Sequence, residues 1–305
     1  MEIRTIICIF AALLVDTLEK IKRNKELDQI MYKPLCYILL MLLGTIRIVA
    51  QPADVLLREQ VDEYLIEARR GVSEAQYNLG VCYLNGKGVT QSYEEAAKWL
   101  EKAAKQGHIE AQYNLGVCYL KGQGVGQDYA EAVKWFALAA KKGDVDAMYN
   151  LATSYMNGEG VVQDIKKAML LYEQASAKGH VQSQRVLGDC YFFGMGIPKD
   201  YKKAIEWYTL AAQNGDADTQ YELGFMYYTG NGAEKCDEMA VFWFRKSAEL
   251  GNAFAQYMMG NCLEKGEGIP QDLDEAMLWY EKAAAQGHEG AMKKIEGKET
   301  KKWEK

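Results

Sequence analysis

The sequence has few of the features that mark most other classes of protein. Only 4 of its 305 residues are proline and only 3 are histidine, whereas 49% are hydrophobic and 26% are charged. This composition excludes a disordered chain, a fibrous chain and a disulfide-dense scaffold, and it leaves a folded, helix-rich protein. The net charge is −6. Because binding to phosphate groups needs a basic face, we expect no nucleic-acid partner.

The chain also lacks an apolar run of the ~18 residues needed to span a bilayer comfortably. Two shorter runs, Ile6–Val15 and Leu35–Ile46, lie in the first fifty residues. Read from Met31, the second run has a short cationic start, an apolar core and a small residue, Ala50, at a suitable cleavage point, which is the layout of a secretory signal. We therefore expect Met31 to be the true start and the mature protein to begin near Gln51.

This prediction divides the N-terminal region in two. Residues 1–30 are an extension that is untranslated or cleaved, and residues 31–50 are a signal peptide. The alternative is that residues 31–50 remain as a membrane anchor, which the bulky Arg47 and Ile48 close to the cut favour. With cleavage the protein is exported and is periplasmic or secreted. No Asn-x-Ser/Thr sequence occurs in the chain, which favours a bacterial cell envelope over a eukaryotic lumen.

A repeat with a period of 36 residues dominates the rest of the sequence. The pair Leu79-Gly80 recurs at this interval without insertion or deletion, as Leu115-Gly116, Leu151-Ala152, Leu187-Gly188, Leu223-Gly224 and Met259-Gly260. Counted from Gly71, six units follow one another, at residues 71–106, 107–142, 143–178, 179–214, 215–250 and 251–286. Residues 287–305 hold a partial seventh unit and a charged tail that we expect to be frayed or solvated.

Each unit reads as two helices joined by a turn. Seven positions of the first unit form two apolar stripes at helical spacing, namely Ala75, Leu79, Tyr83, Ala96, Trp99, Leu100 and Ala103. A glycine pair, Gly86 and Gly88, ends the first helix. The second helix starts at a capping-box spacing, found at Ser92-x-x-Glu95, Asp128-x-x-Glu131 and Asp272-x-x-Glu275. Upstream, residues 51–70 carry one further apolar stripe and are predicted to form an N-terminal capping helix.

These positions carry a family resemblance. Ala-x-x-x-Leu-Gly-x-x-Tyr, followed by Gly-x-Gly-Val, Trp and Ala-Ala, resembles the Sel-1-like repeat, a relative of the tetratricopeptide repeat, over residues 71–286. The resemblance implies an all-α fold, a right-handed superhelical α-solenoid of 36-residue helix-turn-helix repeats, and an adaptor function. Four local departures are expected to loosen packing without changing the fold: Leu171 for Trp, Ala152 for Gly, Cys236 for Asp and Leu263 for Tyr.

The histidines and most cysteines fall at fixed repeat positions. Position 2 holds all three histidines, which indicates a helix N-terminus rather than a metal or catalytic centre: His108, His180 and His288. Position 12 holds four of the seven cysteines: Cys82, Cys118, Cys190 and Cys262. Equivalent positions on neighbouring helices lie about 8–10 Å apart, too far for a disulfide. We therefore expect buried free thiols, no cofactor and no metal.

No catalytic constellation stands out in the sequence. The phosphate-binding pattern Gly-x-x-x-x-Gly-Lys-Ser/Thr is absent. One branch of the resembling family carries paired cysteines and is associated with penicillin binding or hydrolysis, which gives the alternative of an envelope hydrolase of the β-lactamase or penicillin-binding type. This chain lacks those pairs, and it lacks Ser-x-x-Lys, Ser-Asp-Asn and Lys-Thr-Gly. We therefore predict a non-enzymatic scaffold, or a membrane-tethered assembly factor if residues 31–50 are retained.

The binding surface is predicted from residues that the repeat does not require. In the related tetratricopeptide arrangement the first helices line a concave groove, and positions 4, 7, 11, 14 and 15 face it. Position 7 is a tyrosine ladder with one interruption, and the other positions become aromatic in units four to six. The predicted partner-binding residues are Tyr149, Arg185, Phe192, Phe193, Tyr221, Phe225, Tyr228, Phe254 and Tyr257. The alternative is that these rings only fill the inside of the superhelix.

The expected partner is a protein or a peptide. Three acidic residues at position 4 of the early units favour a basic tail on it: Glu74, Glu110 and Asp146. We expect no small-molecule substrate, and membrane contact only through the N-terminal segment if that segment is uncleaved.

Overall fold

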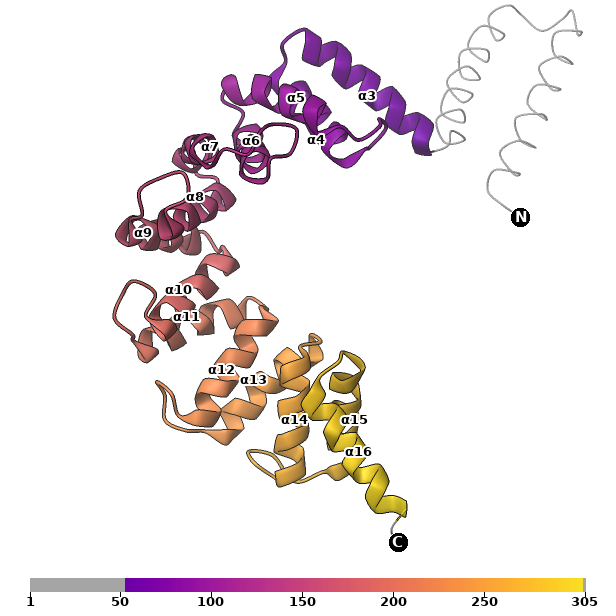
Figure 1. The fold of residues 1–305 in the computed structure, drawn as a ribbon, viewed down its shortest axis with the longest axis vertical. Coiled ribbons are helices and arrows are strands. Elements are labelled where there is room, and N and C mark those ends of the chain that lie inside the picture. Colours follow the sequence, from indigo (N-terminus) through magenta and orange to yellow (C-terminus); the bar gives the residue numbers. More distant parts are fainter. Residues whose placement is uncertain (1–52, 304–305) are drawn as a thin grey trace, which may run out of the picture. The chain divides into compact units, whose positions relative to one another are not determined.

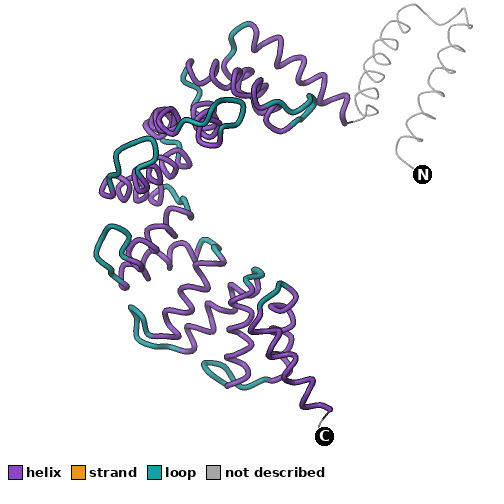
Figure 2. The backbone as a smooth tube through the Cα atoms, in the orientation of Figure 1, coloured by secondary structure: helices purple, strands orange, loops and turns teal. Residues whose placement is uncertain are grey.

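The computed structural model describes residues 53–303, and the side chains of residues 56–297. Regular structure in this range consists of α-helices alone, joined by short loops (Figures 1 and 2). The predicted extension and the signal or anchor, residues 1–30 and 31–50, lie outside the described residues. None of the described helices is both long enough and apolar enough to cross a membrane.

The chain divides into two compact units. The first runs to Ala111 and includes Gln123–Val125, and the second comprises Gln112–Gly122 and the residues from Gly126 onward. In the first unit, α3 (Ala53–Arg69), α4 (Ser73–Asn85) and α5 (Tyr93–Lys105) pack in chain order. Val61 and Ala68 of α3 are buried in one cluster with Leu79. The predicted N-terminal capping helix is therefore present and covers the first repeat.

The second unit repeats the same arrangement of helix pairs. Each helix from α7 onward packs on the next one in the chain (Figure 1). The boundary between the units falls within α6 (Ile109–Lys121). The helices that follow are α7 (Tyr129–Lys141), α8 (Val145–Asn157), α9 (Ile165–Ala177), α10 (Val181–Phe193), α11 (Tyr201–Gln213), α12 (Ala217–Thr229), α13 (Asp237–Glu249), α14 (Ala253–Lys265), α15 (Leu273–Ala285) and α16 (Glu289–Trp303). The predicted all-α solenoid of helix-turn-helix repeats is confirmed.

Both apolar stripes face the packed interior. Of the seven first-unit residues predicted to form them, six are buried and Tyr83 is half-buried. The two helices of a repeat approach closely because position 10 is small. A Cβ placed on Gly188 of α10 would lie 2.3 Å from ring atoms of Tyr208 in α11, which is too close for any side chain. Glycine at this position therefore sets how near the second helix can come.

The two glycines of each turn have different tasks. Gly194 ends α10 with a left-handed backbone (φ 73°), and its N–H donates to the carbonyl of Cys190. Gly196 has a positive φ as well, and a Cβ there would meet the side chain of Ile165, at the start of α9, at 2.9 Å. The first glycine therefore stops the helix, whereas the second lets the loop lie against the preceding repeat.

The predicted capping boxes are only half right. Ser92 accepts a hydrogen bond from the N–H of Glu95, so the N-cap forms as expected. The N–H of Ser92, however, donates to the carbonyl of Tyr83 at 3.0 Å, and Glu95 pairs with Lys98 instead. The carbonyl of Tyr83 lies in the last turn of α4, where no helical N–H is available to it, so this bond satisfies two terminal groups at once.

The C-terminal end continues the repeat pattern. Glu289–Trp303 is one continuous helix, α16, which packs on α15, and Lys293, Glu296 and Gly297 in its charged part are exposed to solvent. Ala291 of this helix is fully buried in the last core cluster. The seventh unit therefore supplies a complete first helix that covers the open end of the sixth repeat.

All five cysteines that the structure describes are free. Cys118, Cys190 and Cys262 are buried, as predicted for position 12, whereas Cys82 is only half-buried. Burial raises the pKa of each of the three buried thiols to about 11. These thiols are therefore part of the packing between helices.

Candidate functional site

The first helices of neighbouring repeats are joined through position 7. Tyr257 of α14 stacks on His288, with ring centroids 4.5 Å apart and an angle of 24° between the rings. Similar ring contacts recur at two earlier boundaries, between Tyr77 and His108 and between Tyr149 and His180. Part of the predicted tyrosine ladder therefore joins one repeat to the next.

The histidines cap helices, as their repeat position predicted. The Nδ1 of His180 accepts a hydrogen bond from the N–H of Ser183 in the first turn of α10. Its Nε2 lies 3.2 Å from the carboxylate of Asp146 in the preceding repeat. His108 is likewise close to two acids, Glu74 at 3.0 Å and Glu110 at 3.2 Å. The three acids predicted to attract a basic tail therefore each face a histidine.

Arg185 interrupts the tyrosine ladder, and a cavity lies beside it. Arg185 lies in α10 at position 7 of the fourth repeat. The following repeat has Asp216 instead of histidine at position 2. A cavity of about 470 Å³ opens here onto α10, α12 and α14, lined by Arg185, Asp189, Asp218, Thr219, Tyr221, Glu222, Asn252 and Phe254. Three of the nine predicted partner-binding residues thus meet at one hollow.

The cavity carries more negative than positive charge. Asp218 lies 3.4 Å from the Arg185 guanidinium, and its other carboxylate oxygen accepts a 2.9 Å hydrogen bond from the Asn252 side chain. Asp189 accepts a 2.7 Å hydrogen bond from the Tyr208 hydroxyl. Burial, followed by the charges of Asp189 and Asp218, raises the pKa of the Glu222 carboxyl. The cavity therefore holds three acids against one arginine.

Aromatic rings flank the acids on one side. The Tyr221 ring lies 5.9 Å from that of Phe254 and 6.2 Å from that of Phe225. Phe254 is 58% exposed, although it also contacts the His288 ring. Phe225 is half-buried and packs against the core around Phe244. Phe254 is thus the ring of this group that is most open to a partner.

Phe192 and Phe193 form a second group, at the C-terminal end of α10. Phe193 is 58% exposed and meets Phe192 edge-on at 4.9 Å. Phe192 in turn contacts Tyr201 and Tyr208 of α11, which ties it to the core. In this group Phe193 is therefore exposed, whereas Phe192 is half-buried.

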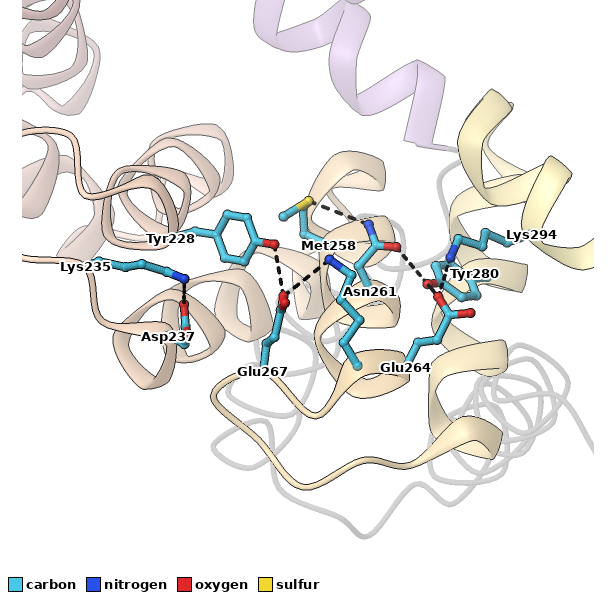
Figure 3. A network of polar contacts seen from close by, with 10 residues as sticks. Tyr228, Lys235, Asp237, Met258, Asn261, Glu264, Glu267, Tyr280 and Lys294 are labelled. Carbon is cyan, nitrogen blue, oxygen red and sulfur yellow. Dashed lines mark hydrogen bonds and ion pairs between the residues drawn. The ribbon is translucent and has the colours of Figure 1, made fainter.

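Tyr228 is held by polar contacts to the next repeat. Its hydroxyl donates to Glu267 at 2.9 Å (Figure 3). Lys265 lies 3.5 Å from the same carboxylate. Nearby, the Tyr280 hydroxyl lies 2.8 Å from the Glu264 carboxylate, which also pairs with Lys294 (Figure 3). Tyr228 is thus engaged in an inter-repeat hydrogen bond.

Sequence reasoning missed the acids that line the cavity. Position 8 is asparagine in the first three units (Asn78, Asn114 and Asn150) but glutamate, Glu222, in the fifth. Position 11 is acidic only in the fourth unit, where it is Asp189. These departures were visible, but only the structure shows that they converge beside Arg185. No group of three His, Cys, Asp or Glu side chains within the described range is arranged to hold a metal ion.

Comparisons with known proteins agree with this architecture. The family model described as Sel1 repeat matches residues 73–108, 109–144, 145–180, 181–216, 217–252 and 253–288. Its units start two residues after ours because they begin at the first helix. No curated protein matches the sequence significantly.

The solved structures that are similar to the chain include two with this type of repeat. One is a protective antigen present in uropathogenic Escherichia coli strains and displaying an SLR fold, with 36% identity and a TM-score of 0.73 over 76% of this chain and 50% of that one. The other is a Sel1 repeat protein from Oxalobacter formigenes, with 34% identity and a TM-score of 0.63 over 71% of this chain and 89% of that one. This chain spans about half the length of the E. coli antigen. With six consecutive repeat matches and the same helical fold, the chain belongs to the Sel1-repeat family.

Proposed function

We propose that the protein is a non-enzymatic scaffold that binds a protein or peptide partner on the first-helix face of its fourth to sixth repeats. We define this face by Arg185, Phe193, Tyr221, Glu222 and Phe254. Sel1-repeat proteins are generally scaffolds for protein–protein interactions, which supports the proposal. The observation that carries it is the charged cavity of about 470 Å³ with the exposed Phe254 at its edge.

Exposed rings beside a polar hollow are typical of interaction hot spots, because a ring buries much apolar area at little entropic cost. The fold does not require Phe254, since equivalent positions in other repeats carry Glu110 or Asp218. Nor does it require Phe193, whose equivalents include Asn85 and Lys121. These two rings are therefore the best candidates for partner contact.

A peptide library displayed on phage tests this proposal. Peptides selected on the purified chain should bind Phe254→Ala and Phe193→Ala about 2 kcal/mol less tightly each. Phe242→Ala serves as the matched control, because Phe242 is 47% exposed but lies on a second helix, α13. Selected peptides that lose affinity only with Phe242→Ala would place the binding surface on the other helices.

We further propose that the protein is exported to a bacterial cell envelope, by cleavage near Gln51. The support is the signal-like layout of residues 31–50. Sequencing of the mature N-terminus should then begin near Gln51. Recovery of a membrane-embedded product that still contains Leu35 would replace secretion with anchoring.

A further inference from the structure

We propose that the cavity facing α10, α12 and α14 binds the guanidinium group of an arginine side chain presented by the partner. This inference rests on the proposed function and names the chemistry of the residue that enters the site. It depends on three observations: the charge of the cavity, the aromatic rings that line it, and the fact that other repeats fold without an acid at the position of Glu222.

The charge of the cavity is unbalanced in the free protein. Arg185 is engaged with Asp218 at 3.4 Å, and Asp189 is engaged with the Tyr208 hydroxyl at 2.7 Å. Glu222 lines the same cavity, and its carboxylate forms no hydrogen bond or ion pair with any residue that the structure describes. A cation placed between Glu222 and Asp189 would neutralise two acids that otherwise repel each other.

The aromatic rings favour an organic cation. Tyr221 and Phe254 line the cavity on the side of α12 and α14, with their ring planes 41° apart. A guanidinium group can lie against such a ring and donate to a carboxylate through the edge of its own plane. A lysine ammonium is a strongly hydrated point charge and gains less from this combination of flat rings and paired acids. Arginine therefore fits the cavity better than lysine does.

The fold does not need an acid at the position of Glu222. The equivalent of Glu222 is Val186 in the preceding repeat and Met258 in the following one, and both units have the same helices. Burial raises the pKa of both Asp189 and Glu222, so their ionised forms are held at a cost to folding. Asp189 also serves the fold as the acceptor for Tyr208, but Glu222 has no such partner in the described part of the chain, and a charged group that lowers stability without serving the fold is typical of a binding site.

The test uses capped tripeptides as probes of the full-length protein. Acetyl-Gly-Arg-Gly-amide is titrated against the chain, and binding is followed through the backbone amide shifts of α12. We expect it to bind at least fivefold more tightly than the peptide with citrulline, the uncharged isostere, and more tightly than the peptide with lysine. Equal affinity for arginine and citrulline would overturn the proposal, as would displacement of the peptide from α12 by calcium at equimolar concentration.

Variants locate the site and separate a binding role from a structural one. Glu222→Gln should weaken arginine binding at least fivefold and at the same time raise the thermal unfolding midpoint, because it removes a carboxylate that burial, and then the neighbouring acids, disfavour. Glu206→Gln, an exposed change on α11 outside the cavity, is the matched control and should leave the affinity within twofold. Unchanged arginine affinity in Glu222→Gln would overturn the proposal.

The two proposals can fail separately. Library-selected peptides that depend on Phe254 but show no preference for arginine would retain the proposed function and remove this inference. The opposite outcome is also possible: arginine tripeptides bind through Glu222, but no selected peptide depends on Phe193 or Phe254. That result would support the cation site and contradict the proposed binding surface.

Discussion

The Tyr208 hydroxyl donates a 2.7 Å hydrogen bond to Asp189, from position 30 to position 11 of the same repeat. Every repeat with tyrosine at position 30 has a polar partner at position 11; the other two pairs are Tyr172 with Thr153 and Tyr280 with Asn261. Repeats with an apolar position 30 are apolar at position 11 as well: Leu100 with Val81, Phe136 with Val117 and Phe244 with Phe225. The two positions are therefore filled as a pair, because a buried hydroxyl needs an acceptor.

This pairing predicts a strong coupling between the two residues. Tyr208→Phe leaves the half-buried Asp189 without its donor and should lower the free energy of unfolding by about 1–3 kcal/mol. Asp189→Val combined with Tyr208→Phe recreates the pair found at Val117 and Phe136, and it should recover most of that loss. A double-mutant cycle from denaturant unfolding measures the coupling. Strictly additive effects would show that the two side chains act independently.

Cys236 predicts a stabilising change. It is the N-cap of α13, but its side chain accepts no capping hydrogen bond from the first turn, whereas Asp200 at the same position of the preceding repeat accepts one from the N–H of Lys203. Cys236→Asp should therefore raise the free energy of unfolding by roughly 1 kcal/mol, and Asp200→Ala should lower it by a similar amount. Chemical denaturation of both variants provides the check. A Cys236→Asp variant no more stable than the parent would mean that the loop before α13 cannot adopt the capped geometry.

The buried thiols should react slowly with alkylating reagents in the native protein. Because the pKa of Cys118, Cys190 and Cys262 is raised to about 11, only about one thiol in a thousand is ionised at pH 8. Alkylation followed by peptide mass spectrometry should label these three only after denaturation, and should label the half-buried Cys236 much earlier. A native disulfide between any two of the three would contradict the helix spacing of the solenoid.

The acids of the cavity predict an unusual dependence of stability on pH. Asp189 and Glu222 have raised pKa values in the folded state, so folding binds protons and the native state loses stability as pH rises above the ordinary carboxyl range of about 4. Asp218, Asp216 and Arg185 are the other charged groups that act on this pair.

Glu222→Gln isolates this effect. The variant should be more stable than the parent at pH 7, with a difference that shrinks as pH falls towards 4. Glu206→Gln, an exposed change on α11, is the control and should alter stability little at either pH. Thermal melts at the two pH values measure the difference. A gain in Glu222→Gln that is equal at both pH values would mean that the ionised carboxylate of Glu222 is not the cause of the lower stability.

The fold could be predicted well from the sequence because the same pattern of residues occurs in six consecutive repeats. Leu79, Gly80 and Gly86 each recur at a fixed interval, so their roles in packing and in the turn could be inferred together. The binding face was harder to predict because its residues have no period. Phe193 and Phe225 look alike in the sequence, yet Phe193 is open whereas Phe225 packs against the core.

Contacts between repeats account for the rest of what the sequence did not show. Tyr228 and Glu267 are 39 residues apart, and their hydrogen bond depends on how one loop lies against the next helix. Glu222 and Asp189 come together only through the stacking of α10 and α12. Because Phe225 packs against the core, Phe225→Ala should lower both the stability of the protein and its affinity for the partner. Phe193 and Phe254 are therefore the cleaner probes of the binding surface.

Site-specific photocrosslinking in cells tests the central claim most directly. A benzoylphenylalanine is placed at Phe193, at Phe254, or at Phe242 on α13, all three of which are exposed. Binding on the first-helix face predicts one shared crosslinked partner from positions 193 and 254 and none from position 242. A partner captured only from position 242 would contradict the account.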